Sequence, residues 1–349
     1  MPRLRRADCS GPGITRRRRG RGWQYLDDYG ATVTDPEIIA RINDLVIPPA
    51  WQEVWICPYP MGHIQAVGTD AAGRKQYLYH VRWRERQDQK KFDHMLEFAR
   101  SLPKMRHACA EHLAEEDFSR ERVLACSARL LDRGFFRVGS EGYAEQNETY
   151  GLATMLKRHV QVDGDSIAFD FTAKGGIRRI QSVVDQDVAE LVAQLKRRRG
   201  GGPELLAYKS AGRWLDVRSA DINEYLKLVT GGDFTAKDFR TWNATVLAAV
   251  ALAVSVNASK TKTARKRAMS RAVQEVAEYL GNTPAIARSS YIDSRVFDRY
   301  GTGWTIAGAL DELGLEDEYG GPAFQGPIEE AVLDLLENKK SSDAVEKTA

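Results

Sequence analysis

Residues 281–291 (GNTPAIARSSY) end in a tyrosine, Tyr291, whose hydroxyl can attack a phosphorus atom if cations hold the phosphate nearby. Apolar residues recur at helical spacing through residues 265–280, and Gly281 stands where a helix ends in a left-handed residue. Thr283 then fits an N-cap and Pro284 the first helical position. This pattern places Asn282 in a tight connection and Tyr291 at the end of a short helix. A lone tyrosine there is more often an ordinary interfacial aromatic, so the basic residues upstream decide the question.

Four basic residues upstream are candidate phosphate ligands. Arg137 follows two phenylalanines, a context in which an arginine taken alone simply extends its head group to solvent. Lys174 stands at the tip of a predicted hairpin (FTAKGG), where glycines let a ligand or a backbone approach closely. Lys237 and Arg240 share one face near the start of a strongly apolar helix. Cations there oppose the helix dipole, and an anionic ligand would explain them.

The order and spacing of five segments resemble the type IB DNA topoisomerases, in particular the poxvirus-like and bacterial branch. The segments are GRKQYLY (73–79), RVGSEGYAEQNETYGLATM (137–155), FTAKGG (171–176), KDFRTW (237–242) and SSYID (289–293). One such motif would be weak evidence, but five in the family order, over most of the chain, are strong.

The resemblance implies a reaction and a role for each residue. Tyr291 would be the nucleophile that forms a 3′-phosphotyrosyl link and releases a 5′-hydroxyl. Arg137 and Arg240 would hold the non-bridging oxygens, because a planar guanidinium fork matches a phosphate. Lys174 would be the general acid that protonates the leaving oxygen, and Lys237 a nearby DNA-phosphate contact. Two reversible transesterifications conserve the bond energy, so we expect no ATP, cofactor or metal ion; no GxxxxGK[ST] motif occurs in the chain.

Two positions depart from the family pattern. Viral members have a histidine as a further phosphate contact, whereas this chain has no histidine after His159 and carries Asn282 in its place, as the bacterial branch does. The amide can donate a hydrogen bond but carries no charge, so we expect a weaker contribution and the same reaction. Asn243 stands where glycine is expected, which bears on local packing only.

Three residues of the first domain match family positions that meet DNA: Gln76, Tyr77 and Tyr79. Strand alternation puts both tyrosines on one face, and glutamine can read adenine in a major groove. The alternative is an ordinary half-buried strand face.

The predicted fold class is α+β, with a small mostly-β N-terminal domain and a larger mainly α catalytic domain that contains a small three-stranded sheet, as in tyrosine recombinases and type IB topoisomerases. We predict a basic disordered arm over residues 1–22, a β-rich DNA-binding domain over 23–85, the catalytic domain over 86–338 and a frayed tail over 339–349. The domain boundary is placed near residues 81–89, which must flex if the domains close on DNA.

Short strands are expected at 51–58, 63–68 and 75–80, a short helix at 35–44, and a three-stranded insertion at 157–184. Helices are predicted at 82–102, 103–116, 120–133, 185–198, 219–229, 236–256, 263–280 and 284–290.

Composition favours a polyanionic partner. The chain has a net charge of +3, but residues 311–349 carry eleven acidic and three basic residues, so the rest is strongly basic. Solvated charged surface is the bland alternative. No apolar run reaches the roughly 18 residues of a membrane span, and the Arg-rich start lacks an apolar segment typical of a secretory signal.

The cysteines indicate a reducing cytoplasm, because Cys9, Cys57, Cys109 and Cys126 are widely spaced. The resemblance to the bacterial branch implies that this cytoplasm is bacterial and that the protein associates with the nucleoid. His107, Cys109 and His112 lie close together, with Cys126 beyond, but their spacing matches no zinc motif, so we expect no metal site.

Two other functions remain open from the sequence. A tyrosine recombinase shares the fold and chemistry, but it usually has histidine where Lys237 begins Lys-x-x-Arg, and it lacks the GRKQY-type domain. A non-catalytic architectural protein that binds duplex DNA explains the charge but not Tyr291 with its basic set. We expect a monomer that clamps duplex DNA and has no contact with a membrane.

Overall fold

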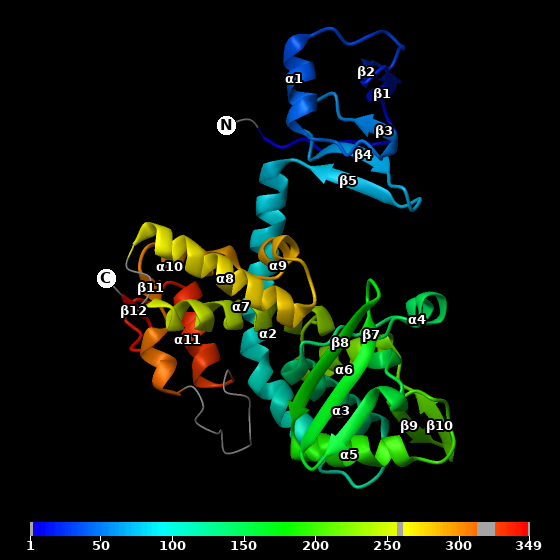
Figure 1. Cartoon of the computed structure of the whole chain (residues 1–349), viewed down its shortest axis with the longest axis vertical. Helices are drawn as coiled ribbons and strands as arrows, with labels where there is room; N and C mark the ends of the chain where they lie inside the picture. Colours follow the sequence, from blue (N-terminus) through cyan, green and yellow to red (C-terminus); the bar gives the residue numbers. More distant parts are fainter. Residues whose placement is uncertain (1–2, 257–260, 313–324, 348–349) are drawn as a thin grey trace. The chain divides into compact units, whose positions relative to one another are not determined.

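A computed structural model describes residues 3–256, 261–312 and 325–347 of the chain (Figure 1). The chain divides into two units, Met1–Asp93 and His94–Ala349. The architecture is α+β as predicted: the first unit is built on a five-stranded sheet, and the second is mainly helical with a small three-stranded sheet.

The first unit is an antiparallel sheet of order β2-β1-β3-β4-β5 with one helix packed on it. Its elements are β1 (Ile14–Arg19), β2 (Gly22–Leu26), α1 (Pro36–Asp44), β3 (Gln52–Ile56), β4 (Ile64–Thr69) and β5 (Lys75–Tyr79). The helix starts where its sequence predicts, because the Asp35 carboxylate accepts the Glu37 N–H and Pro36 stands at its first position. Ile14, Ile42 and Ile56 are buried in its core.

The prediction of a disordered arm over residues 1–22 is wrong for Ile14–Arg19. This run forms β1, which lies between β2 and β3. Ile14 is buried, and the Arg16 guanidinium lies over Trp23 while donating to the Pro48 and Trp51 carbonyls. A run of arginines therefore serves as a strand, because one apolar anchor and the hydrogen-bonding capacity of Arg16 order it.

The expected linker near residues 81–89 is also wrong, because these residues belong to the helix α2 (Val81–Leu113). The unit boundary falls after Asp93, inside this helix, and not at residue 85. Residues 81–93 contain no glycine or proline and are rich in Arg, Glu, Gln and Lys, which are good helix formers. Pro103 lies inside the same helix without ending it, where the neighbouring Leu102 and Met105 are buried.

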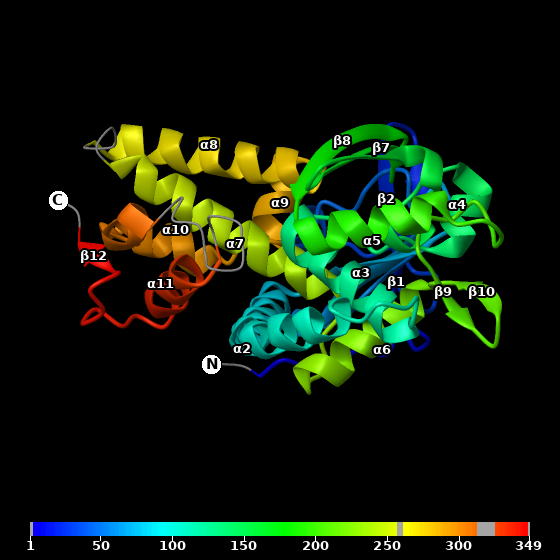
Figure 2. The same cartoon turned by 90° about the horizontal axis from the view of Figure 1, so that it is seen from below.

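The three-stranded sheet of the second unit confirms the predicted insertion. Its strands are β6 (Val160–Asp163), β7 (Ser166–Ala173) and β8 (Ile177–Val184), in that order and antiparallel. Gly175 and Gly176 both have positive φ (84° and 75°) in the turn between β7 and β8, which is why this tight hairpin carries glycines. The helices α3 (Arg120–Gly134) and α5 (Gln186–Arg197) lie on the same side of this sheet (Figure 2).

Helices α8 (Lys262–Leu280) and α11 (Pro327–Leu336) pack against α7 (Ala236–Val254), which lies between them in both views (Figures 1 and 2). Near-complete burial of α7 explains its continuous apolar sequence. The other helices are α4 (Glu141–Asn147), α6 (Ser219–Thr230), α9 (Pro284–Ser290) and α10 (Ser294–Gly301), with short 3₁₀ turns at Leu152–Thr154, Lys157–His159 and Ala307–Glu312.

Besides β1 and β2 of the first unit, four strands of the second unit were not predicted from the sequence. β9 (Ala207–Ser210) pairs with β10 (Arg213–Asp216), and β11 (Trp304–Thr305) pairs with β12 (Glu346–Lys347). The second pair corrects the prediction of a frayed tail over 339–349, because Val345 is buried and β12 is tied to β11.

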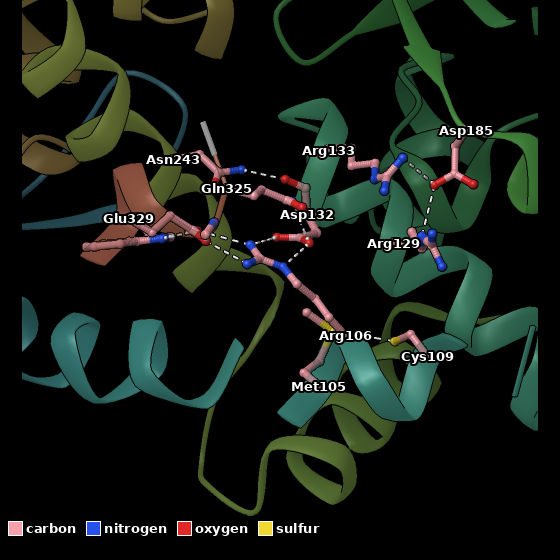
Figure 3. Close-up of polar contacts among 12 residues, drawn as sticks. Met105, Arg106, Cys109, Arg129, Asp132, Arg133, Asp185, Asn243, Gln325 and Glu329 are labelled. Atoms are coloured by element: carbon pink, nitrogen blue, oxygen red, sulfur yellow. Dashed lines mark hydrogen bonds and ion pairs between the residues drawn. The ribbon is translucent and has the colours of Figure 1, made fainter. Parts of the chain in front are cut away.

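Buried ion pairs connect the helices of the second unit (Figure 3). Arg106 of α2 donates to Asp132 of α3 (2.8 and 3.0 Å) and to Glu329 of α11 (2.6 and 3.0 Å). Arg129 and Arg133 of α3 both meet Asp185, the N-cap of α5. These pairs fix α2, α3, α5 and α11 to one another.

Within residues 3–256, 261–312 and 325–347, none of the helices combines the length and apolar character needed to cross a membrane.

Candidate active site

One cavity of about 300 Å³ in the second unit brings together five of the predicted site residues. It is lined by Arg137, Lys174, Lys237, Arg240 and Tyr291, together with Val138, Gly139, Ser140, Thr149, Tyr150 and Ala236. These residues come from a loop, a hairpin and two helices that lie far apart in the sequence. The cavity therefore confirms that the fold gathers this set at one place.

Tyr291 caps the C-terminal end of α9, as the local sequence predicts. Its backbone N–H donates to Ala287 O (3.1 Å), and the Thr245 hydroxyl of α7 donates to its carbonyl (3.3 Å). Burial by itself would raise the pKa of Tyr291, but the positive charges of Arg240, Arg137 and Lys237 outweigh it and leave the pKa below its usual value. A tyrosine hydroxyl with a lowered pKa is a better nucleophile near neutral pH.

Arg240 is buried on α7, with its guanidinium carbon 5.2 Å from the centre of the Tyr291 ring. Its two Nη atoms donate to the carbonyls of Phe135 (2.7 Å) and Leu280 (2.8 Å), whereas its buried Nε has no hydrogen-bond partner among the described residues. Burial and the charge of Arg137 lower the pKa of Arg240 to about 10. A buried cation with an unused donor beside the tyrosine is suited to an anionic ligand.

Arg137 lies in the loop after α3, and the backbone fixes it in place. Leu152 N donates to the Arg137 carbonyl (2.8 Å), and Gly151 approaches Gly139 so closely that a Cβ on Gly151 would lie 2.4 Å from the Gly139 Cα. Phe136, the preceding residue, is buried edge-on against Phe169. The motif glycines therefore make the close approach that holds Arg137 at the cavity.

Asn282 does not line the cavity but is joined to it through Arg137. Arg137 Nη2 donates to Asn282 Oδ1 (2.5 Å) and to the Gly281 carbonyl (3.2 Å). The amide oxygen is therefore occupied, while the buried Asn282 Nδ2 has no acceptor among the described residues. This orientation leaves the N–H donors of the amide nitrogen for a ligand.

The C-terminal end of α8 explains how three arginines can lie so close together. Gly281 ends this helix with φ 60°, and the Asn282 N–H returns to Ala277 O (2.9 Å). Four consecutive carbonyls at this end, from Glu278 to Gly281, accept hydrogen bonds from arginines: two from Arg179, one from Arg240 and one from Arg137. The negative end of a helix dipole and its unpaired carbonyls stabilise cations.

Lys174 and Lys237 are the exposed members of the set. Lys174 lies in the turn between β7 and β8, and Lys237 lies in the first turn of α7. Thr235 is the N-cap of that helix, and its backbone N–H donates to the Asp238 carboxylate (2.8 Å). Lys237 and Arg240 are three residues apart as predicted, but only Arg240 is buried.

The first unit carries the three predicted DNA contacts on β5. Tyr77 and Tyr79 lie on one face as predicted, about 40% exposed, with their rings stacked 6.0 Å apart. Gln76 alternates with them on the strand, and its amide donates to Asp70 Oδ2 (2.9 Å). The two tyrosine side chains therefore contact each other on one face of β5, whereas the Gln76 side chain is bonded to Asp70.

Sequence reasoning missed Arg179 and Tyr150. Tyr150 lines the cavity, and Arg179 holds the α8 carbonyls. The sequence gives no local signal for either residue. The hydrogen bonds of Arg179 depend on how β8 packs against α8.

His107, Cys109 and His112, which lie close together in the sequence, each contact a different residue. His112 Nδ1 lies 2.7 Å from the Tyr225 hydroxyl, Cys109 Sγ contacts Met105, and His107 lies beside Glu111. Asn243, the other departure from the family pattern, donates to the Asp132 carbonyl (3.0 Å) and so joins α7 to α3 (Figure 3).

Comparison with known proteins identifies the family. Residues 80–304 match the family model of the eukaryotic DNA topoisomerase I catalytic core, and residues 22–70 match that of the bacterial DNA topoisomerase IB N-terminal domain. The chain is 30% identical over 283 residues to DNA topoisomerase 1B of Acanthamoeba polyphaga mimivirus, covering 79% of this chain and 83% of the relative. It is 20% identical over 263 residues to DNA topoisomerase 1B of Vaccinia virus (strain Western Reserve), covering 75% and 79% of the two chains.

The chain therefore belongs to the type IB DNA topoisomerases. It is an enzyme of that class, which acts on DNA, and the predicted family is confirmed. The recombinase and architectural alternatives are set aside, because both family models and the relatives named above are topoisomerases.

Proposed function

We propose that this topoisomerase relaxes supercoiled duplex DNA through a transient break in one strand, with Tyr291 as the nucleophile. The Tyr291 hydroxyl oxygen bonds to a backbone phosphorus as the bond from phosphorus to the 5′-oxygen breaks. The phenolic proton goes to solvent, and Lys174 gives a proton to the departing 5′-oxygen. Religation is the reverse reaction, which needs neither ATP nor a metal ion.

Arg137, Arg240 and Asn282 stabilise the transition state in this proposal. The supporting observations are two buried atoms without a hydrogen-bond partner among the described residues: Nε of Arg240, which lies beside Tyr291, and Nδ2 of Asn282, whose Oδ1 is bonded to Arg137. Donors fixed in place before the reaction are worth most where charge builds on the non-bridging oxygens. Lys237 adds a phosphate contact at the exposed rim.

The partner is duplex DNA, bound by a monomer that clamps the duplex with both units, and Gln76, Tyr77 and Tyr79 contribute contacts from β5. The N-terminal family model, named for bacterial enzymes, supports a bacterial protein that works in the cytoplasm at the nucleoid. The domain functions follow: the unit Met1–Asp93 binds DNA and the unit His94–Ala349 carries the chemistry. Sedimentation that finds a stable dimer without DNA would contradict the monomer.

The single observation that carries the mechanism is the shared cavity of Arg137, Lys174, Lys237, Arg240 and Tyr291. The test is relaxation of positively and negatively supercoiled plasmid in EDTA without ATP, with Tyr291→Phe beside the unmodified protein. We expect relaxation by the unmodified protein only. Relaxation that survives Tyr291→Phe would assign the nucleophile elsewhere, and a shifted plasmid band without relaxation would leave only DNA binding.

A further inference from the structure

Arg179 of β8 is the residue that fastens the β7–β8 hairpin to the end of α8. Its Nη1 donates to the Glu278 carbonyl (2.6 Å) and its Nη2 to the Tyr279 carbonyl (2.6 Å). The fit is close, since a Cβ on Gly281 would lie 3.1 Å from Arg179 Nη1. Both carbonyls belong to the last turn of α8, where few backbone N–H groups remain to bond them; Glu278 O accepts the Gly281 N–H (3.1 Å) as well as Arg179.

The anchor lies close to the turn that carries Lys174. Arg179 pairs with Phe171, the third residue pair from the turn, after Ala173–Ile177 and Thr172–Arg178. On the opposite strand the Thr172 carbonyl accepts the Tyr150 N–H (2.8 Å). Both strands of the hairpin are therefore anchored near the tip. On β7 the anchor is the backbone hydrogen bond of Thr172, and on β8 it is the side chain of Arg179.

Little free space separates the hairpin from the end of α8. A cavity of only about 20 Å³ lies between them, lined among others by Lys174, Ile177, Arg179, Leu280 and Gly281. Because the hairpin packs closely on the end of α8, we expect loss of the Arg179 hydrogen bonds to shift the hairpin relative to this helix.

We propose that Arg179 is a positioning residue, which places the Lys174 ammonium group for proton transfer by bonding the hairpin to the α8 carbonyls. This inference rests on the proposed function, in which Lys174 is the general acid. The planar guanidinium fork reaches two neighbouring carbonyls at once, whereas an ammonium group at the same place acts as a point charge. Arg179→Lys therefore keeps the charge and loses the double anchor.

Arg178 provides a matched control on the same strand. It points to the other side of the hairpin and pairs with the exposed Asp170 (2.5 Å). Arg178→Ala removes the same charge from the neighbouring position and leaves the α8 contact intact.

The experiment measures single-turnover cleavage of two duplexes that differ in one atom. In the first the leaving atom is the normal 5′-oxygen; in the second it is a 5′-bridging sulfur. A thiolate leaves without a proton because its pKa is far below that of an alcohol, so a defect in general acid catalysis disappears on the sulfur duplex. Lys174→Ala is the reference variant, and thermal unfolding checks that each variant folds.

We expect Arg179→Ala and Arg179→Lys to cleave the oxygen duplex on the order of 10²-fold more slowly than the unmodified enzyme, and the sulfur duplex within a few-fold of it. Arg178→Ala should cleave both duplexes normally. An equal defect of the Arg179 variants on both duplexes, or normal cleavage by Arg179→Lys, would overturn the proposal. If Arg179→Ala fails to fold, Arg179→Lys gives the same comparison. Failure of Lys174→Ala to recover on sulfur would instead contradict the general-acid role itself.

Discussion

At the scale of single residues, the neighbours of Tyr291 set the pKa of its hydroxyl. Burial raises this pKa, and the charges of Arg240, Arg137 and Lys237 lower it by more. The site therefore stabilises the ionised form of the tyrosine, which is the form that the proposed reaction requires.

The first prediction concerns this titration. In the free enzyme Tyr291 should ionise below the ordinary tyrosine pKa of about 10. The measurement is the difference between the alkaline absorbance titrations of the unmodified protein and Tyr291→Phe. Arg240→Gln removes the nearest charge and should move the Tyr291 titration to higher pH. No change in that variant would contradict the electrostatic account.

The second prediction concerns the unused amide donor of Asn282. Asn282→Ala should slow single-turnover cleavage by about 10²-fold, the usual effect of losing one donor to a charged transition state. Asn282→Asp keeps the oxygen that accepts from Arg137 but replaces Nδ2 with a second oxygen, so it should be slower still. Equal rates for the two variants would mean that the amide faces away from the phosphate.

The sequence could predict the identities of Arg137, Lys174, Arg240, Asn282 and Tyr291, because each stands in a motif with local punctuation. It could not predict that Arg137 and Arg179 share the end of α8. That contact joins residues more than ninety positions apart in the chain, and no spacing encodes it.

At the scale of elements, α7 must hold Arg240 steady, and α11 is fastened to it. Trp242, two residues after Arg240, donates through its indole N–H to Glu329 Oε1 (2.7 Å). The same carboxylate accepts from Arg106, which also pairs with Asp132 (Figure 3). Burial tends to lower the pKa of Arg106, but these two carboxylates together raise it above its usual value.

The third prediction is that Glu329→Ala destabilises the protein. It leaves the buried Trp242 N–H unpaired and the partly buried Arg106 with one partner, which costs about 1–3 kcal/mol of unfolding free energy. Urea unfolding measures the change. Glu330→Ala on the exposed side of the same helix is the control and should change the unfolding free energy by less than about 0.5 kcal/mol. A similar small effect of both variants would mean that the ion pairs add nothing.

Most helices were predictable because their caps and apolar spacing are local signals, as at Asp35, Thr235 and Gly281. β1 was not, because four consecutive arginines indicate a solvated arm until the Trp23 ring and the Pro48 carbonyl are in place. β11 and β12 were missed because two-residue strands pair across a long sequence separation.

At the scale of the whole molecule, the proposed clamp requires the first unit to contribute contacts to DNA. The rings of Tyr77 and Tyr79 are exposed and stacked on each other, so they offer an aromatic surface for such a contact. Such a surface adds contact area, while most affinity comes from phosphates and falls with salt.

The fourth prediction is that Tyr77→Ala with Tyr79→Ala weakens DNA binding about tenfold or more without lowering the unfolding free energy, because both side chains are exposed. Fluorescence anisotropy with a labelled duplex, at several salt concentrations, measures the affinity. Tyr29→Ala, at the most exposed tyrosine of the same unit, is the control and should bind normally. Unchanged affinity of the double variant would remove β5 from the DNA contact.

In the proposed reaction, Tyr291 forms a covalent bond to the 3′ end of a broken strand. This bond can be tested by trapping the enzyme on a duplex whose short downstream strand dissociates after cleavage, and by identifying the DNA-linked peptide by mass spectrometry. We expect one adduct, at Tyr291, through a 3′-phosphate and with a free 5′-hydroxyl on the released strand. An adduct at another residue, or a 5′-phosphate linkage, would contradict the proposed reaction.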